Sequence, residues 1–231
     1  MQIAKLDREL AQKDRELAKS ERQVAQQNRE LAEKERRLTD SRIKLMMSQI
    51  RSHFIFNVLT TISTYCKIDA KMADKALIRF SRYLRRNIHI IEVDGLIDFS
   101  VELEQLEDYV ELEKLRFGDR IIFATEIETS SFKIPPLTVQ PLVENAIKHG
   151  LVKKEEGGVI FLHTERKENN IVITVADDGV GFAPGMLEKT DSVGIKNVRY
   201  RLENMTGGTL DIESEPGNGT TVTIKIPQKG E

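Results

Sequence analysis

Residues 135–150 read PPLTVQPLVENAIKHG, a pattern typical of a buried helix. Polar side chains nevertheless stand along it, namely Glu144, Asn145, Lys148 and His149. Asn145 and His149 are four residues apart and share a helix face, where an amide oxygen for a hard cation and a donor for phosphate could converge. A polar face open to solvent explains the same residues, so this stretch alone does not define a site.

A second stretch, VADDGVGF at residues 175–182, places an acidic residue at the predicted end of a strand, ahead of two glycines. Glycines let the backbone turn and approach a ligand closely. Asp177 could accept a hydrogen bond from an exocyclic amine and so select adenine over guanine. Gly179 and Gly181 follow it, but an Asp-Gly pair by itself predicts only a turn.

Two further glycine motifs lie downstream: SVGIKNVRYRL begins at Ser192, and GNGTTVT begins at Gly217. Gly194 opens a predicted helix, whose free N–H groups and dipole favour phosphate. In the other motif, Gly219 and Thr220 lead from a tight turn into a strand. The segment just before Gly194 shows little periodicity, which fits a lid over a nucleotide and an ordinary surface loop equally well.

The residues around these motifs alternate between strand and helix patterns. β-Branched stretches predict strands at 121–127, 159–164, 171–175, 209–212 and 220–226. Helical patterns cover 137–149 and 194–205. Helices on one face of a mixed sheet form an α/β sandwich, and we expect this domain to span residues 118–231.

Upstream, residues 45–117 predict three helices, whose apolar stripes place them at 45–65, 73–91 and 100–117. The first two form an antiparallel hairpin, which buries only one face. Pairing two copies into a four-helix bundle is the usual solution for such a hairpin. We therefore expect these residues to form a homodimerisation region.

Residues 1–44 carry an apolar residue at every seventh position, from Ile3 to Leu38. A strict seven-residue repeat implies a left-handed coiled coil, although most of these heptads offer one apolar residue only. A solvated spacer helix and a signal-carrying dimer coil both fit the pattern. The predicted fold class of the whole chain is α+β: a coiled coil, a helical hairpin for a dimeric four-helix bundle, and an α/β sandwich.

The composition indicates which partners and which cellular compartment to expect for the chain. Lys and Arg total 35 against 37 Asp and Glu, a net charge of −2, so no basic field favours nucleic acid as a partner. Cys66 is the only cysteine, which excludes an internal disulfide and fits a reducing compartment. The sequence contains no run of about 18 apolar residues, so it predicts no membrane span. We expect a cytoplasmic chain, with any membrane sensor upstream of it in a longer protein.

The four motifs together, ENAIKHG, DDGVGF, Gly194 and GNGT, resemble the N box and the three glycine boxes of the GHKL (Bergerat-type) ATPase domain. Gyrase B, Hsp90, histidine kinases and MutL share this domain. The resemblance implies that Asn145 binds Mg²⁺ and that Asp177 receives the adenine amine of ATP. It also implies that ATP is bound or framed by Lys148, His149, Gly179, Gly181, Gly194, Gly219 and Thr220.

Residues 49–57, QIRSHFIFN, resemble the HFxFN phosphoacceptor motif of sensor histidine kinases of the LytS and YehU type. Further marks of this family, LIRFSRYLR from Leu77 and VELEQLEDYVELEKLRFGDR from Val101, extend the resemblance over residues 45–227. It implies that His53 takes the γ-phosphoryl group of ATP. It also implies transfer of that group to an aspartate in the receiver domain of a response regulator, of the LytTR type.

The resemblance assigns further roles near the histidine. Asn57 lies one helical turn beyond His53 and is expected to position water for dephosphorylation. Phe54 stands where many histidine kinases carry an acidic base. A carboxylate of the third helix, at Glu102 or Glu113, is the suggested base in its place.

Two rival functions are a GHKL-type hydrolytic ATPase and a coiled-coil dimer scaffold with a degenerate or regulatory nucleotide pocket. Gyrase and MutL carry a water-activating glutamate one turn before the Mg²⁺ asparagine. Here Pro141 takes that place, which argues against efficient hydrolysis. The scaffold would fit the sparse glycines ahead of Gly194.

Overall fold

The computed structural model of the chain describes residues 26, 34, 52–93, 95–183 and 193–228. It divides into two units, Met1–Ser52 and His53–Glu231. Apart from Gln26 and Lys34, the predicted coiled coil lies outside the described residues, as does nearly all of the predicted lid before the second glycine motif. Both therefore stay predictions.

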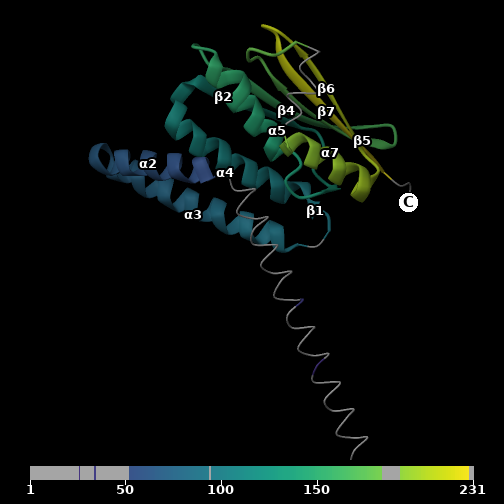
Figure 1. Cartoon of the computed structure of the whole chain (residues 1–231), viewed down its shortest axis with the longest axis horizontal. Coiled ribbons are helices and arrows are strands. Elements are labelled where there is room, and N and C mark those ends of the chain that lie inside the picture. The colour runs from purple at the N-terminus through teal and green to yellow at the C-terminus, as the bar shows by residue number, and fades with distance from the viewer. Residues whose placement is uncertain (1–25, 27–33, 35–51, 94, 184–192, 229–231) are drawn as a thin grey trace, which may run out of the picture. The chain divides into compact units, whose positions relative to one another are not determined.

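The second unit begins with three helices: α2 (Ser52–Ile68), α3 (Ala70–Glu92) and α4 (Phe99–Phe117) (Figure 1). They confirm the three helices predicted within residues 45–117, except that residues 45–51 of the first lie outside the described residues. Asp69 separates α2 from α3 and caps α3, because its carboxylate accepts the backbone N–H of Met72 at 3.0 Å. α4 ends at Gly118, whose φ of 62° suits glycine.

Aromatic rings fill the space between α2, α3 and α4. The ring centroid of Phe54 lies 5.2 Å from that of Tyr83 and 5.0 Å from that of Tyr109. Aromatic pairs at such distances stabilise a core by about 0.5–1.5 kcal/mol beyond their buried area. Val58 and Ile62 continue the buried face of α2. The described part of the apolar face of this helix therefore packs inside one chain.

The C-terminal part is a five-stranded sheet in the order β2-β4-β5-β7-β6. Its strands are β2 (Ile121–Ile127), β4 (Gly158–Lys167), β5 (Asn170–Asp177), β6 (Thr209–Glu215) and β7 (Gly219–Pro227). β2 runs parallel to β4 and the other neighbouring pairs are antiparallel, so the sheet is mixed, as predicted. Ile160 and Leu162, two positions apart on β4, are fully buried on one face.

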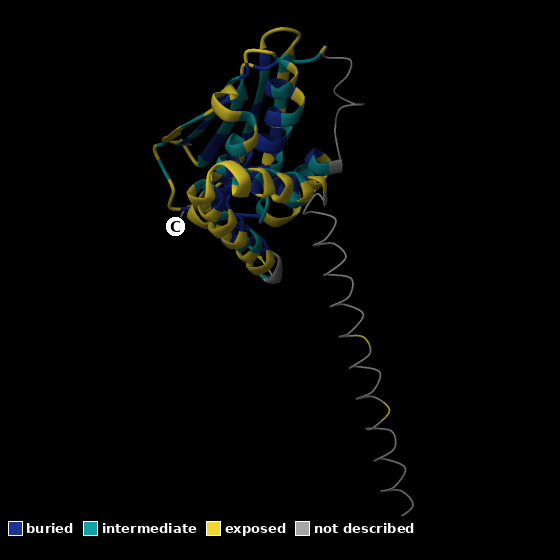
Figure 2. Ribbon diagram, turned by 90° about the vertical axis from the view of Figure 1, so that its left-hand side faces the viewer, coloured by how far each residue is buried: buried dark blue, intermediate teal, exposed yellow. Residues whose placement is uncertain are grey.

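Two helices, α5 (Gln140–Asn145) and α7 (Val193–Thr206), lie on one face of the sheet (Figure 1). Buried residues concentrate between these helices and the strands that they face (Figure 2). The expected α/β sandwich is therefore confirmed.

The start and the end of α5 differ from the prediction. The predicted helix 137–149 begins only at Gln140, because Leu137 has a left-handed φ of 54° that no helix accepts. After α5 the chain continues as a π-helical turn over Ala146–Gly150 and a 3₁₀ turn over Leu151–Lys153. Neither turn could be predicted, because each changes the spacing of the apolar residues only slightly.

Two short elements were missed. β1 (Ile97–Asp98) pairs with β3 (Lys133–Ile134) in a separate antiparallel ladder. A 3₁₀ turn over Gly118–Arg120 joins α4 to β2. Segments of two or three residues are too short to repeat either pattern, so the sequence did not predict them.

Ion pairs tie α3 to α4 at the rim of their contact. Arg79 contacts Glu111 at 2.7 Å. Arg86 contacts Glu104 at 2.6 Å and Asp108 at 2.8 Å. Most of these groups are partly exposed, so each pair contributes at most about 1 kcal/mol.

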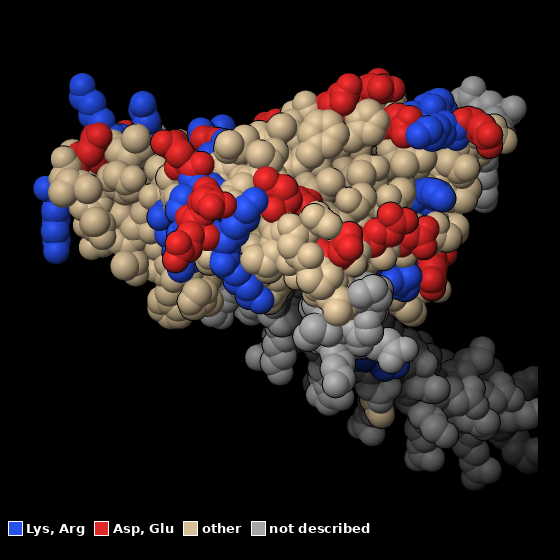
Figure 3. Space-filling model, turned by 90° about the horizontal axis from the view of Figure 1, so that it is seen from above, with Lys and Arg blue, Asp and Glu red and all other residues tan. Residues whose placement is uncertain are grey.

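The surface shows no dominant charge on the face that Figure 3 presents. Basic and acidic side chains of the described residues lie beside one another there, rather than in separate patches of one sign (Figure 3). This fits the small net charge of −2. Among the residues that the structure describes, no helix is both long and apolar enough to cross a membrane.

Candidate functional site

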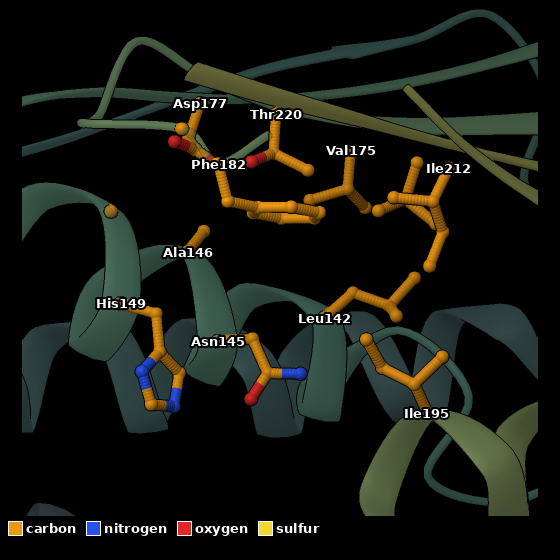
Figure 4. Close-up of a pocket in the computed structure, with 13 residues that line it drawn as sticks. Leu142, Asn145, Ala146, His149, Val175, Asp177, Phe182, Ile195, Ile212 and Thr220 are labelled. Atoms are coloured by element: carbon orange, nitrogen blue, oxygen red, sulfur yellow. The ribbon is translucent and has the colours of Figure 1, made fainter. Parts of the chain in front are cut away.

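A pocket lies between the sheet and the helical segment formed by α5 and its π turn, with the start of α7 beside it (Figure 4). It is lined by Leu142, Asn145, Ala146, His149, Gly150, Val175, Asp177, Gly181, Phe182, Ile195, Ile212, Thr220 and Val222. Most of these side chains are apolar, and a few polar ones stand at the edges. Such a lining is typical of a site for a small molecule.

Asp177, the last residue of β5, brings a carboxylate to the pocket. Its Oδ1 accepts a hydrogen bond from the backbone N–H of Gly179 at 2.9 Å. Burial raises the pKa of this carboxyl to about 6; the Gly179 N–H opposes the rise and the Asp178 carboxylate adds to it. At neutral pH the group is therefore largely ionised and can accept a hydrogen bond from an amine.

Close backbone packing explains why glycines surround this carboxylate. A Cβ atom on Gly179 would lie 2.4 Å from Cα of Gly150, and one on Gly150 would lie 2.6 Å from Oδ1 of Asp177. Gly219 has a φ of 79°, and a Cβ there would lie 1.8 Å from the carbonyl oxygen of Asp177. These glycines allow the close packing because they have no side chain, and Gly150 and Gly181 also line the pocket.

Asn145 and His149 line the helical side of the pocket. Figure 4 shows their side chains side by side, pointing away from the strand end that carries Asp177. The predicted shared face is therefore confirmed. His149 lies in the π turn, a distortion frequent at functional sites. Lys148 is not among the lining residues, and its Nζ lies 3.8 Å from Oε2 of Glu144.

The pocket gathers most of the predicted ATP-binding residues. Those that line it directly are Asn145, His149, Asp177, Gly181 and Thr220. Gly179, Gly194 and Gly219 lie within two residues of lining positions in the chain. Motifs read separately along the sequence thus meet at one place.

Sequence analysis missed two residues that shape the pocket. The ring of Phe182 lies between the strands and α5, near Asp177 and Thr220 (Figure 4). Its backbone N–H donates to Oγ of Ser214 at 3.0 Å, and that hydroxyl donates to the carbonyl of Gly219 at 2.9 Å. An aromatic residue directly after DDGVG was a readable signal for Phe182. Ser214, a polar residue on an alternating strand, offered none.

The second candidate site is on α2, where His53 is exposed. Its Nδ1 lies 3.0 Å from the amide nitrogen of Asn57, one turn further along the helix. The four-residue spacing brings these two side chains together on the helix surface. Phe54 is buried in the aromatic cluster and anchors this turn. The imidazole is therefore held locally and remains accessible from outside.

The two carboxylates suggested as a base for the histidine have other partners. Glu102 is fully buried and accepts the backbone N–H groups of Val139 and Gln140, and burial raises its pKa to about 7. Glu113 is also buried and accepts the hydroxyl of Tyr109 at 3.2 Å. This geometry does not support either residue as a base for an exposed imidazole.

Comparison with known proteins agrees with these observations. Residues 41–121 match the family described as histidine kinase. Residues 137–230 match the family described as histidine kinase-, DNA gyrase B-, and HSP90-like ATPase. An exposed histidine on a helix, followed by this type of ATPase domain, defines the class of protein. It is that of the histidine kinases.

The relatives narrow this class. The chain is 38% identical to the uncharacterized protein YwpD of Bacillus subtilis (strain 168) over 189 residues, which cover 78% of this chain and 68% of YwpD. It is 35% identical to the sensor histidine kinase YpdA of Escherichia coli (strain K12) over 193 residues, covering 80% of this chain and 34% of YpdA. It is 31% identical to the sensor protein LytS of Oceanobacillus iheyensis over 201 residues, again covering 80% and 34%.

The chain therefore belongs to the family of sensor histidine kinases of the LytS and YpdA type. It spans about a third of the length of YpdA and of LytS.

Proposed function

We propose that this chain binds Mg²⁺-ATP in its pocket, phosphorylates His53, and passes the phosphoryl group to an aspartate of a response regulator in the cytoplasm. One unit holds both a nucleotide-type pocket and an exposed histidine, and this observation carries the proposal. In the first step, an imidazole nitrogen attacks the γ-phosphorus, and the bond to the bridging oxygen breaks. ADP leaves with that electron pair, and the imidazole proton passes to solvent.

The two sides of the pocket suit the two ends of ATP. On the strands, the ionised Asp177 accepts a hydrogen bond from the exocyclic amine of adenine, while Val175 of β5 and Leu142 of α5 pack against the base. On the helix, the amide oxygen of Asn145 is a ligand of the type that Mg²⁺ takes, and His149 beside it donates to a phosphate. A bound Mg²⁺ supplies neutralisation of phosphate charge.

The orientation of the Asn57 amide decides which nitrogen of the imidazole carries the proton. As the two side chains lie, the amide nitrogen of Asn57 faces Nδ1 of His53, which leaves the ring proton on Nε2. Turning the amide by half a rotation brings its oxygen to Nδ1, where it accepts the ring proton. The lone pair on Nε2 is then free for attack. The expected role of Asn57 in positioning water stays a separate prediction.

Exposed apolar side chains on α2 and α3 support the proposed homodimer. Five of these side chains are 45–69% exposed: Phe56, Leu59, Leu77, Ile78 and Ile88. A second copy would cover them in a four-helix bundle. Phe56→Asp should then turn a dimer into a monomer in size-exclusion chromatography with light scattering. A dimer that survives this change would have to form through other contacts.

The hydrolytic rival lacks its key group in the pocket helix. Pro141 lies in the first turn of α5, where proline suits a helix start because its missing N–H has no partner there anyway. It offers no carboxylate to activate water. Transfer to a protein histidine is therefore better supported than hydrolysis.

The test is incubation of the full chain with γ-labelled ATP and Mg²⁺. We expect acid-labile, base-stable label in the wild type and none in His53→Gln. His89→Gln is the matched control, because His89 is also exposed but lies on α3. Label that persists in His53→Gln would disprove the acceptor assignment. A wild type that binds ATP but takes no label would favour the scaffold function.

A further inference from the structure

The helix that carries Asn145 has no cap from its own sequence. Val139 precedes α5 and provides no side-chain cap. Instead, Glu102 of α4 accepts the backbone N–H groups of Val139 and Gln140, the latter at 3.2 Å. A carboxylate stabilises the first turn of a helix because it satisfies these N–H groups and opposes the helix dipole. The start of α5 is therefore held by a residue of α4.

The side chain of Gln140 then joins three helices. Its Nε2 donates to the hydroxyl of Tyr83 on α3 at 2.9 Å and to Oε1 of Glu144 on α5 at 2.9 Å. Its Oε1 accepts Nε2 of Gln105 on α4 at 2.9 Å. Gln140 is 4% exposed, so these bonds lie inside the protein. A buried amide that uses both N–H groups and its oxygen holds its partners in one arrangement.

Two partners of Gln140, Tyr83 and Glu144, each lie next to one of the two candidate sites. The ring of Tyr83 packs against that of Phe54, at 5.2 Å between centroids, and Phe54 directly follows His53. At the other end, Glu144 directly precedes Asn145 at the pocket. Continuous buried contacts thus connect the exposed histidine with the proposed Mg²⁺ ligand.

We propose that Gln140 is a positioning residue for phosphoryl transfer, which sets the helix of Asn145 relative to the helices that carry His53. This inference rests on the function proposed above. Gln140 does not line the pocket, so it acts on transfer through the orientation of α5 and not through contact with ATP. Misplacement of reacting groups by about 1 Å costs roughly 100-fold in rate.

A residue that served stability alone would behave differently. Losing any buried hydrogen bond lowers the stability of a domain, wherever the bond lies. Thr164 on β4 provides the matched control, because it is fully buried and its Oγ1 donates to the carbonyl of Thr129 at 2.6 Å. Thr164→Val should lower the melting temperature without slowing transfer.

Gln140→Met keeps the length of the side chain and removes its hydrogen bonds. We expect its labelling rate at saturating ATP to fall at least ~10-fold, while its Kd for ATP changes by less than ~2-fold. Tyr83→Phe should slow labelling about 3-fold. The double variant should be no slower than Gln140→Met, because both changes remove the same hydrogen bond between Gln140 and Tyr83. An equal rate loss in Thr164→Val, or a loss of ATP affinity as large as the loss of rate, would overturn the proposal.

Hydrogen exchange separates a failure of this inference from a failure of the proposed function. A non-hydrolysable ATP analogue with Mg²⁺ requires no phosphoryl transfer. In the wild type, we expect the analogue to slow exchange in α3 as well as in α5 and β5; in Gln140→Met, it should slow exchange in α5 and β5 only. If α3 does not respond in the wild type, or still responds in the variant, Gln140 does not link the sites. An unlabelled wild type with the expected exchange pattern would disprove kinase function but keep the link.

Discussion

The proposed nucleotide pocket and the proposed phosphoacceptor turn are built in opposite ways. The pocket draws side chains from α5 and its π turn, β5, β6, β7 and α7, between Leu142 and Val222 in the sequence, and packs them around a half-buried carboxylate. His53 and Asn57 come from one turn of α2 and lie at the surface. A pocket has to hold a nucleotide, whereas an acceptor has to be reached. Variants in the two regions should therefore fail in different ways.

The largest effect is expected for Gly179→Ala, because its Cβ would lie 2.4 Å from the backbone of Gly150. Backbone cannot move aside as a flexible side chain does. We expect a loss of about 1–3 kcal/mol in the free energy of unfolding. If ATP binding must return the displaced Asp177 to its place, a free-energy cost of about the same size would lower ATP affinity about 100-fold. Denaturant titration and equilibrium nucleotide binding measure the two losses.

Gly217→Ala is the matched control, since Gly217 has a φ of 85° but nothing lies within 4 Å of an added Cβ. It should cost about 1–2 kcal/mol of stability through backbone strain and leave ATP affinity unchanged. If both glycine variants bind ATP as the wild type does, close packing does not shape the pocket.

A smaller effect is expected at the acceptor turn. Asn57→Ala should slow labelling of His53 about tenfold, because the imidazole loses the group that orients it. ATP affinity and melting temperature should stay unchanged. Asn204→Ala is the control, since the Asn204 amide donates to the carbonyl of Tyr200 at 2.7 Å with the same spacing on α7. A loss of ATP affinity in Asn57→Ala would contradict a role of Asn57 confined to the acceptor turn.

The smallest effect concerns pH. The pKa of Asp177 is raised to about 6, and in the proposed binding mode the adenine amine needs the ionised carboxylate. ATP affinity should therefore fall about fourfold between about pH 7 and pH 5.5. Asp177→Asn should bind more weakly and lack this part of the pH dependence. Parallel pH profiles in the two proteins would rule out titration of Asp177 as the cause.

The same shift has a consequence for stability without nucleotide. The folded protein holds this proton more tightly than the unfolded chain, whose ordinary pKa is 3.8. Ionisation of Asp177 therefore penalises the folded state above about pH 6, and the penalty disappears as pH falls from 6 toward 4. Relative to Asp177→Asn, the wild type should gain melting temperature over that range.

Much of the fold could be predicted because its patterns are local. The five main strands and the three upstream helices follow from periods of two and 3.6 residues in the chain. The left-handed Leu137 and the π turn after Asn145 could not, since a bend in the backbone leaves hydrophobic spacing almost unchanged. β1 and β3 are too short to show any period.

The candidate site was predictable to a similar degree. Asn145 and His149 share a helix face through their spacing alone, and Asp177 stands at a strand end before two glycines. Glu102 was one of two carboxylates suggested as a base, but in the structure it caps α5. A carboxylate in a helical pattern looks the same in both roles.

Taken alone, the amino-acid sequence specifies the order of the elements and the residue types of the pocket, because periodicity and motif spacing are properties of neighbouring residues. The tertiary structure is needed to show which buried polar groups meet, such as Gln140 with Tyr83 and with Gln105. A buried polar side chain must have a partner, but any donor or acceptor that packing brings within reach can fill that role. The identity of the partner therefore appears only when distant segments have packed together.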